Sequence, residues 1–529
     1  MQISIDRKLT QLVDRYLIPI LIGLSLLLWL IFLGNVPLKD WDEGTYALIA
    51  REIMRTGDWI YLKIQGDPFL LKPPLGMWAI AFAYQIGGIS EFTTRLPCAI
   101  LTAIGVPILY QISYLLFNQK TPALLSALVY LTLLPVVRHG RLAMLDGMSI
   151  TFWLLSLLCL LYAHRDRRWS IGIGLMLGLI TLTKGLLVIV FGLIILLILI
   201  ATRQLSLLKS PYLWLGLTIG QIPATAWYLA QYHQYGDPFI QVHFFAQSFD
   251  RLSQSVEDHQ GPIWFYAFDI IEYTFPWLLF IPGGMVLAWR NSNQNWARFA
   301  LIGGVVYFAI VSLMKTKLNW YIMPVYPFLA VFAGAYLSLI WQGEKPIYTT
   351  ARFGWLSFAA FAGMVGCGYF AIVERDPILV LMSLSLAVSM GLAAAFVKQQ
   401  NRLFIPTLFI GMYLVLFGLM SSHSWIWEIN SDFQVKPVGQ LIHQHVARDS
   451  KVYSSLPGGR PSLDFYADAK IEPTPLDRLP QLLAQHQTIL IDRQFLLKSA
   501  SLPANQQLKQ PYQILGQTEK FALIKSHQQ

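Results

Sequence analysis

The sequence predicts an all-α protein that crosses a membrane many times and carries a small α/β domain near its C-terminal end. Hydrophobic residues make up 55% of the 529 positions and charged residues only 13%, whereas soluble proteins carry about 25% charged residues. Apolar runs close to the roughly 20 residues that a spanning helix needs recur as far as residue 421. Beyond about residue 431 the chain becomes polar and contains strand-like segments.

About thirteen apolar runs are predicted to be membrane-spanning helices. They cover roughly residues 16–34, 95–117, 121–137, 147–163, 170–183, 186–202, 211–230, 264–289, 297–314, 320–341, 352–373, 377–397 and 402–421. Lys and Arg residues are enriched in cytoplasmic loops, so Arg7, Lys8 and Arg15 place the N-terminal end in the cytoplasm. Every second connection after it is also basic. Because the number of spans is odd, the C-terminal segment is expected on the outer side.

The predicted organisation is therefore a transmembrane domain of residues 1–430 followed by a soluble extracytoplasmic α/β domain of residues 431–529. Strand-like KVYSS, TILID and FALIK and the helix-like LDRLPQLLAQ support the second domain. Two large outer connections interrupt the first domain, at residues 36–94 and 231–263. The apolar stretch 75–88 is too short to span and is expected to be a helix on the outer membrane face.

Composition also excludes several classes of protein. The formal net charge of +10 is spread thinly between apolar runs and forms no patch for a nucleic acid. The three cysteines lie far apart in apolar stretches, which argues against a disulfide framework or a cysteine metal site. The first apolar run lacks a small-residue cleavage site, so we expect a helix there and no cleavable signal.

The first outer connection contains a predicted amphipathic helix that an acidic cluster precedes. Tyr46, Ile49 and Ile53 recur at helical spacing, and Gly57 is suited to end the helix. Asp42 stands at the start of this helix beside Glu43. An Asp at this position either satisfies free backbone donors as an N-cap or serves chemistry, and composition alone favours neither role.

Six cations gather on the predicted outer face, although basic residues generally favour the cytoplasmic side. They are Lys72, Arg138, Arg141, Lys184, Lys315 and Lys317. An ionisable group within a span costs about 2.5–3.5 kcal/mol and usually marks function, although a single long cation can also reach the interface by snorkelling. Together these cations suit an anionic ligand at the membrane surface, such as a lipid phosphate.

A series of short motifs occurs along the first two thirds of the chain. In order they are DE-x-x-YA from Asp42, GDW from Gly57, KPP-x-x-x-W from Lys72, R-x-x-MLD from Arg141, TKG from Thr183, YGDPF from Tyr235, H-x-GP from His259 and K-x-x-WY-x-x-P-x-YP from Lys317. In this order, on the predicted outer face, they resemble the C-type glycosyltransferases. The most similar members are the bacterial relatives of protein O-mannosyltransferases and the lipid A aminoarabinose transferases, over roughly residues 38–330.

The resemblance implies an inverting enzyme of the inner (plasma) membrane that transfers a sugar from a polyprenyl phosphate to a lipid or protein acceptor on the outer side. It implies Asp42 as the general base, with Glu43 and Asp146 as further catalytic carboxylates. Lys72, Lys184, Arg141 and Arg251 are implied as ligands of the donor phosphate, and Tyr46, Tyr321, Lys317 and His259 as substrate-binding residues. No nucleotide takes part; a divalent metal stays open as a cofactor, but the sequence contains no clear ligand set for one.

The sequence departs from the aminoarabinose branch at several positions. Thr45 stands where that branch usually has Arg, Leu71 replaces an acidic residue, and Ser248–Phe249 replaces an E-H pair. The resemblance therefore predicts the reaction class and leaves the sugar and the acceptor open.

Two other functions use similar lipid substrates. A transporter or flippase should carry paired charges near the centres of its spans and broken helices in two matching halves, whereas the charges here lie at the outer rim. A ligase or polymerase for lipid-linked sugars would share the donor but not these motifs.

Overall fold

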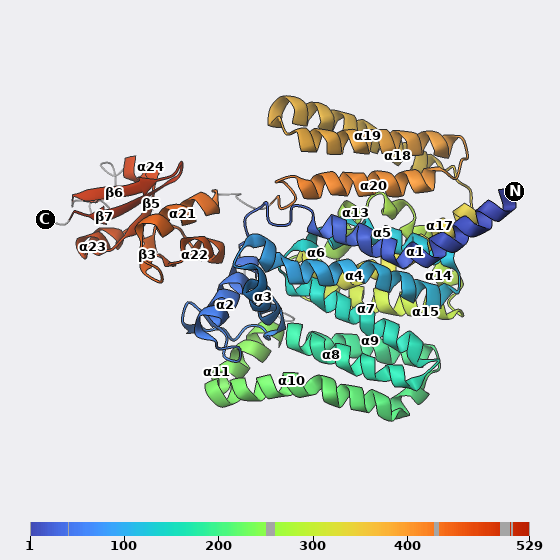
Figure 1. The fold of residues 1–529 in the computed structure, drawn as a ribbon, viewed down its shortest axis with the longest axis horizontal. Coiled ribbons are helices and arrows are strands. Elements are labelled where there is room, and N and C mark those ends of the chain that lie inside the picture. The colour runs from blue at the N-terminus through green and yellow to red at the C-terminus, as the bar shows by residue number, and fades with distance from the viewer. Residues whose placement is uncertain are drawn as a thin grey trace. The chain divides into compact units, whose positions relative to one another are not determined.

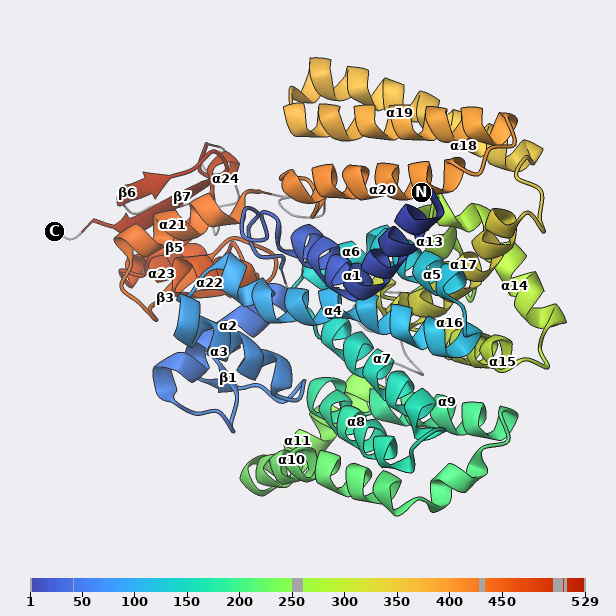
Figure 2. The same cartoon turned by 45° about the vertical axis from the view of Figure 1, so that its right-hand side comes forward.

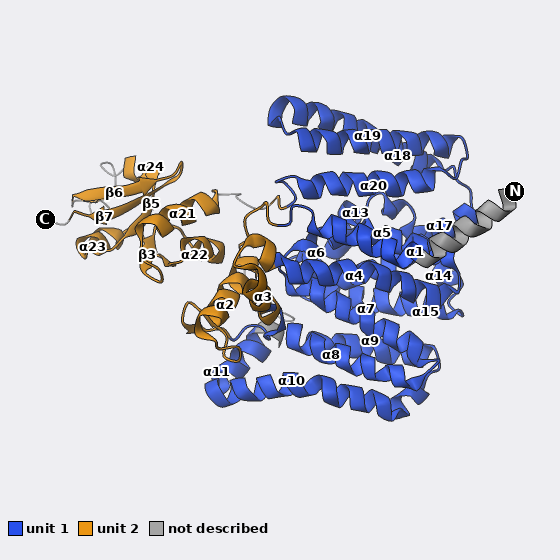
Figure 3. Cartoon of the chain, viewed as in Figure 1, with its two compact units in different colours: residues 1–33, 70–76, 95–425 blue, residues 34–69, 77–94, 426–529 orange. Residues whose placement is uncertain are grey.

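The computed structural model describes residues 2–40, 42–249, 260–427, 433–497, 508 and 511–527, and it is mostly helical (Figure 1). The chain divides into two compact units, shown in blue and orange in Figure 3. Unit 1 comprises Met1–Leu33, Leu70–Gly76 and Arg95–Trp425, and unit 2 comprises Gly34–Phe69, Met77–Thr94 and Ile426–Gln529.

Unit 1 is a bundle of helices whose long members lie side by side in both views (Figures 1 and 2). Its first helices are α1 (Gln2–Leu30), α4 (Glu91–Phe117, which begins in unit 2), α5 (Lys120–Leu131), α6 (Leu134–Arg141), α7 (Leu145–Ala163), α8 (Ser170–Lys184), α9 (Leu187–Ala201), α10 (Pro211–Tyr235) and α11 (Asp237–Ile240). They continue with α13 (Phe265–Tyr273), α14 (Ile281–Arg290), α15 (Asn295–Leu301), α16 (Tyr307–Leu313), α17 (Tyr326–Gln342), α18 (Thr350–Tyr369), α19 (Pro377–Lys398) and α20 (Phe404–Ser421).

The bundle confirms a helical protein with several membrane spans. Within the described residues, seven helices are long and apolar enough to cross a membrane, and two bent pairs raise this number to nine. The bent pairs are α5 with α6 and α13 with the segment Trp277–Arg290. Each of the thirteen runs predicted from the sequence contains helix, but several of these helices are shorter than a full span.

Glycines bring α8 and α10 unusually close together. Both helices carry a G-x-x-x-G pattern, Gly174 with Gly178 and Gly216 with Gly220. A Cβ atom on Gly178 would collide with the backbone of Gly220. Small residues at this spacing allow the backbones of membrane helices to approach each other. The close approach fixes the position of Lys184, at the end of α8, relative to Tyr228 of α10.

Unit 2 contains a five-stranded sheet with the order β4-β3-β5-β7-β6 (Figure 1). The strands are β3 (Lys451–Ser454), β4 (Lys470–Pro473), β5 (Ile489–Asp492), β6 (Tyr512–Gln517) and β7 (Phe521–Ser526). The pairs β3–β4 and β3–β5 are parallel, whereas β5–β7 and β6–β7 are antiparallel. The sheet confirms the three predicted strands. It also contains β4 and β6, which the sequence analysis did not identify.

Two apolar clusters in unit 2 contain residues of the sheet and of the neighbouring helices α21 (Val435–His445), α22 (Pro461–Ala467), α23 (Leu479–Ala484) and α24 (Arg493–Leu497). The first contains Val438, Leu463 and Leu490, and the second contains Leu479 and Ile489. Leu490 and Ile489 are neighbours on β5, and side chains of successive strand residues point to opposite faces. The two clusters therefore lie on opposite faces of the sheet.

Unit 2 also includes most of the first outer connection. This segment forms α2 (Asp42–Thr56), the short strands β1 (Lys63–Ile64) and β2 (Asp67–Pro68), and α3 (Leu75–Gly87, which begins in unit 1). The structure confirms the helix predicted after Asp42, which ends at Gly57 with a positive φ of 73°. Leu38, Ala47 and Leu48 pack with Phe465 of α22 in a third apolar cluster. The compact unit therefore joins residues near position 40 to residues near position 465, whereas the sequence suggested a boundary at residue 430.

Candidate functional site

Within unit 1, Lys184, Asp146 and Tyr321 lie close together. Asp146 is in the first turn of α7 and Lys184 is the last residue of α8. The Lys184 Nζ donates to Asp146 Oδ1 at 2.5 Å and lies 5.8 Å from the centre of the Tyr321 ring. Each charge also lies at the helix end that its sign favours. The sequence offered no partner for Lys184, and the structure provides one 38 residues earlier in the chain.

The residue after Lys184 is packed against a histidine–tyrosine pair. Gly185 has φ +58°, a conformation that side chains rarely adopt, and a Cβ there would lie 3.0 Å from the Tyr228 hydroxyl and 3.4 Å from His243 Nε2. The same added Cβ would lie 3.9 Å from Cγ of Pro73, the residue directly after Lys72. The TKG and KPP motifs are thus neighbours in unit 1, with Tyr228 and His243 beside them.

His243 ties the Lys72 segment to α10 by two hydrogen bonds. Its Nδ1 lies 3.0 Å from the carbonyl oxygen of Leu70, and its Nε2 lies 3.0 Å from the Tyr228 hydroxyl. Burial lowers the pKa of the His243 imidazole to about 4, although the hydrogen bond to Leu70 opposes this shift. The ring is therefore neutral near pH 7. Because a carbonyl can only accept, Nδ1 carries the proton, and Nε2 accepts from Tyr228.

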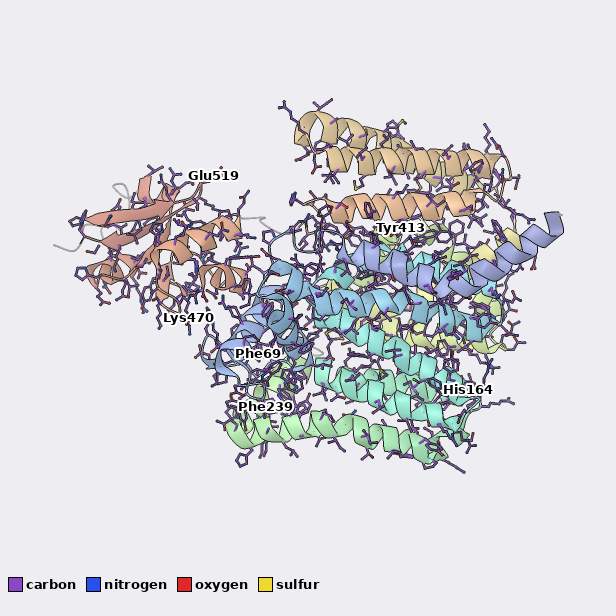
Figure 4. All side chains as sticks on the ribbon, in the orientation of Figure 1. Phe69, His164, Phe239, Tyr413, Lys470 and Glu519 are labelled. Carbon is purple, nitrogen blue, oxygen red and sulfur yellow. The ribbon has the colours of Figure 1, made fainter. Side chains whose placement is uncertain are left out.

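Aromatic rings surround this histidine. The ring centres of Trp227, Tyr228, Phe239 and Phe244 lie between 5.1 and 6.0 Å from that of His243. Phe239, labelled in Figure 4, belongs to α11 just after α10. Sequence reasoning noted the YGDPF motif that ends at Phe239 but missed His243 four residues later. A histidine inside an aromatic cluster was the available signal.

Two other predicted cations of unit 1 bind backbone carbonyl groups. Lys317 Nζ donates to the carbonyls of Val311 and Ser312 at 3.2 and 2.6 Å, and so caps the last turn of α16. The Arg141 side chain is fully buried. Its guanidinium donates to carbonyls in α1 and α20 and to Ile31, and it lies 4.6 Å from the Trp425 ring. The structure thus gives both residues a role in holding helices together.

The acidic motif lies in unit 2, where its two carboxylates have different surroundings. Glu43 is fully buried, and its Oε2 accepts from the backbone amide of Lys39 at 2.8 Å. Asp42 is partly exposed, and its Oδ1 accepts from the Tyr46 hydroxyl at 3.0 Å. Tyr46 itself is buried on α2. Glu43 therefore stabilises the turn before the helix, whereas the Asp42 side chain is partly exposed at the first residue of α2.

Two predicted site residues, Arg251 and His259, lie outside the described residues. In the part of the chain that is described, no group of three or more His, Cys, Asp or Glu side chains could hold a metal ion.

The arrangement provides two kinds of chemistry. Unit 1 offers the Lys184 ammonium group at the end of α8 and Lys72 in the segment before α3, and cations of this kind suit binding of a phosphate. Unit 2 offers a partly exposed carboxylate at the start of a helix, which suits general-base chemistry.

Comparisons with known proteins point to the same kind of protein as the motifs. A family model described as dolichyl-phosphate-mannose-protein mannosyltransferase matches residues 71–228. An undecaprenyl phosphate-alpha-4-amino-4-deoxy-L-arabinose arabinosyl transferase of Pectobacterium atrosepticum is 29% identical over 370 residues, which are 67% of this chain and 64% of the relative. A relative with the same description, numbered 1, from Pseudomonas fluorescens is 30% identical over 60% of this chain and 59% of its own length. The chain thus spans less than two thirds of the length of these relatives.

Solved structures show the same fold. The crystal structure of ArnT from Cupriavidus metallidurans bound to undecaprenyl phosphate matches with a TM-score of 0.74 and 18% identity over 96% of this chain and 97% of that chain. The apo structure of the same protein gives a TM-score of 0.73 over 97% of this chain and 98% of that chain. These comparisons confirm the resemblance that the motifs predicted.

Proposed function

Because the chain resembles the polyprenyl-phosphate-dependent membrane glycosyltransferases in sequence and shares the fold of one of them, we propose that it is an inverting glycosyltransferase. Its donor is a sugar linked to a polyprenyl phosphate, and its acceptor is a hydroxyl group of a glycolipid or a protein. The observation that supports this most strongly is the Asp146–Lys184 pair beside Tyr321, because three motifs of the resemblance supply these residues.

The proposal includes a topology. The chain crosses the plasma membrane about thirteen times, its N-terminal end is cytoplasmic, and the region 431–529 is extracytoplasmic. The outer connections 36–94 and 231–263 then share one side of the membrane with the motifs. Basic residues at every second connection support this orientation.

We assign the donor phosphate to Lys184 and Lys72, with Arg251 as a further ligand. Asp146 holds the Lys184 ammonium in place, and Tyr321 offers an aromatic face and a hydroxyl beside it. The neighbouring His243–Tyr228 pair supports the segment that carries Lys72. A phosphate leaving group held by two cations departs more readily, because positive charge stabilises the negative charge that develops on it.

We assign the general base to Asp42. It takes the proton of the acceptor hydroxyl while the acceptor oxygen bonds to the anomeric carbon. The bond from that carbon to the phosphate oxygen breaks, and the polyprenyl phosphate leaves with the electron pair. Attack from the face opposite the phosphate inverts the configuration. Tyr46 orients the base through its hydrogen bond, and Glu43 keeps the turn in place.

The experiment that tests this function compares envelope glycolipids and glycoproteins by mass spectrometry, with and without the gene. Loss of one sugar from one acceptor, together with accumulation of the lipid-linked sugar, is the expected result. A flippase would instead change the distribution of the carrier between the leaflets and leave the sugar–phosphate bond intact. Purified protein that never releases undecaprenyl phosphate from a sugar-linked donor would contradict the proposed transfer.

A further inference from the structure

We propose that the segment Arg460–Ser462 positions the acidic motif for catalysis, with Arg460 as the positioning residue. This inference rests on the proposed function of Asp42. All of its contacts lie within unit 2, and they join residues about 420 positions apart in sequence.

The first contact holds Asp40, two residues before Asp42. The Arg460 guanidinium donates to Asp40 Oδ2 through Nε at 2.7 Å and also through Nη2. The backbone amide and the hydroxyl of Ser462 donate to the other carboxylate oxygen. Both members of the ion pair are largely buried, with 17% of each side chain exposed. A charge-assisted pair with donors on two nitrogens fixes direction as well as distance. Asp40 is thus engaged on both oxygens.

The second contact is steric. Gly44, two residues after Asp42, lies directly against the backbone of Pro461 and Ser462. A Cβ on Gly44 would lie 2.5 Å from the Ser462 nitrogen and 2.8 Å from the Pro461 carbonyl carbon. Only glycine permits this approach. The same segment therefore holds the motif on both sides of Asp42.

A third contact lies just before the motif. The backbone amide of Leu38 donates to the Tyr466 hydroxyl of α22 at 2.8 Å. Tyr466 in turn donates to Glu91 at 3.1 Å, and Lys436 pairs with the same carboxylate oxygen at 2.6 Å. With these three contacts, Leu38, Asp40 and Gly44 are held by side chains and backbone of residues 460–466.

The far end of α2 provides a matched control. Arg55 donates to both carboxylate oxygens of Asp468 at 2.5 and 2.7 Å, so it also joins the first outer connection to the C-terminal segment. Arg55 lies 13 residues after Asp42, which places it about four helical turns away. Loss of this pair loosens the same packing without touching the acidic motif.

The test compares Arg460→Met with Arg55→Met in the full-length protein. The substrate is undecaprenyl phosphate-linked 4-amino-4-deoxyarabinose, or the lipid-linked sugar that accumulates without the gene. Displacement of a catalytic group by about 1 Å costs up to 100-fold in rate, so Arg460→Met should lower kcat about 10- to 100-fold and leave the donor KM unchanged. Arg55→Met should retain kcat within about threefold. It should nevertheless lower the melting temperature by at least as much as Arg460→Met does.

A double-variant cycle and hydrogen exchange complete the test. Asp40→Asn should lower kcat like Arg460→Met, and the double variant should be no worse than either single variant, because partners in one contact are not additive. Amide exchange of residues 38–44 should accelerate in Arg460→Met but not in Arg55→Met. Equal kcat in the two arginine variants, or unchanged exchange in Arg460→Met, would overturn the inference. A wild-type protein that does not release undecaprenyl phosphate would instead overturn the proposed function, while the exchange result would still decide the positioning.

Discussion

Asp42 and Glu43 are neighbours in sequence, but their environments differ: Glu43 is buried and accepts from a backbone amide, whereas Asp42 is partly exposed. The resemblance named Asp42 as the base, but the sequence could not show that Glu43 is buried, because burial depends on residues far away in the chain. The same limit applies to Lys317 and Arg141, whose hydrogen bonds to backbone carbonyl groups could not be predicted from the sequence. Lys184 was identified from its motif, whereas its pairing with Asp146 needed the structure.

Replacement of Asp42 by Asn tests the division of roles. Asn caps a helix about as well as Asp and accepts the Tyr46 hydrogen bond, but it cannot take up a proton. Loss of a general base typically lowers the rate about 10²- to 10⁴-fold, and we expect that loss with donor binding intact. Glu43→Gln is the matched control, since its amide oxygen can still accept from Lys39. A purified Asp42→Asn protein with near wild-type turnover would reduce Asp42 to a helix cap.

Lys184 should contribute to the affinity for the lipid phosphate. A charge-assisted contact contributes roughly 1.5–3 kcal/mol, so Lys184→Met should weaken binding of undecaprenyl phosphate about 10- to 100-fold. This change also removes the Lys184 ammonium from the Asp146 carboxylate, which can lower the stability of the protein. The double variant Lys184→Met with Asp146→Asn therefore separates the effect on phosphate affinity from the effect on stability. Lys398→Met, at the end of α19, removes an equal charge elsewhere. Titration of nanodisc-embedded protein should show weakening in the first two variants and not in the third.

The stability of unit 2 should depend on the protonation of Asp464. Burial raises the pKa of this carboxyl to about 7, although the hydrogen bond from Ile471 and the charges of Arg51 and Lys470 act in the opposite direction. A raised carboxyl pKa means that the folded state prefers the proton, so stability falls as pH rises from about 4 to about 7. Asp464→Asn should therefore protect the β3 and β4 amides from hydrogen exchange more at pH 8 than at pH 5. An equal effect at both pH values would contradict the assignment.

At the scale of helices and strands, periodicity in the sequence was a reliable guide. The structure confirms the apolar runs as helices, the amphipathic helix after Asp42 and the strands β3, β5 and β7. It also contains β4 and β6, which the pattern did not reveal. The four residues KIEP of β4 end in a proline, and β6 is an edge strand with a glycine and a register shift. Such strands are defined by their pairing partners, which a local pattern does not contain.

The close packing of α8 against α10 makes its own prediction. Gly178→Leu should force the two helices apart, because an overpacked contact costs roughly 1–3 kcal/mol. The variant should melt at a lower temperature in detergent and should also lose affinity for donor, since α8 ends at Lys184 and α10 carries Tyr228. Gly192→Leu is the control, because a Cβ at this position on α9 meets open space. Similar melting of both variants would show that the glycine contact is not critical.

For the whole molecule, the proposed orientation can be checked directly. A reporter that is active only in the cytoplasm should be silent when it is fused after Gln529. The same reporter after Gln400, in a predicted cytoplasmic loop, should be active. These outcomes follow from an odd number of spans and a cytoplasmic N-terminal end. Activity after Gln529 would reverse the topology and remove the outer-face assignment of every motif.

The largest feature that the sequence did not reveal is the composition of unit 2. Composition separates an apolar part from a polar part, and the predicted boundary at residue 430 follows that change. Contacts instead group the first outer connection with the C-terminal segment. Pairing across several hundred residues leaves no periodic signal, so Arg460 and Asp40 could not be matched from one sequence.

The distance along the chain between Asp40 and Arg460 also orders events during biosynthesis. The two residues are 420 positions apart, and ribosomes add about 5–20 residues per second, so roughly 20–80 s separate their synthesis. Throughout that interval the growing chain already carries Asp42 but still lacks the residue that we propose orients it. We therefore expect the proposed transfer to reach its full rate only after Arg460 has been made, so that a chain abandoned midway would consume little of the cell's carrier lipid. Truncated chains that stop before Arg460 should insert into the membrane yet consume the lipid-linked sugar at least about 10-fold more slowly than the full chain.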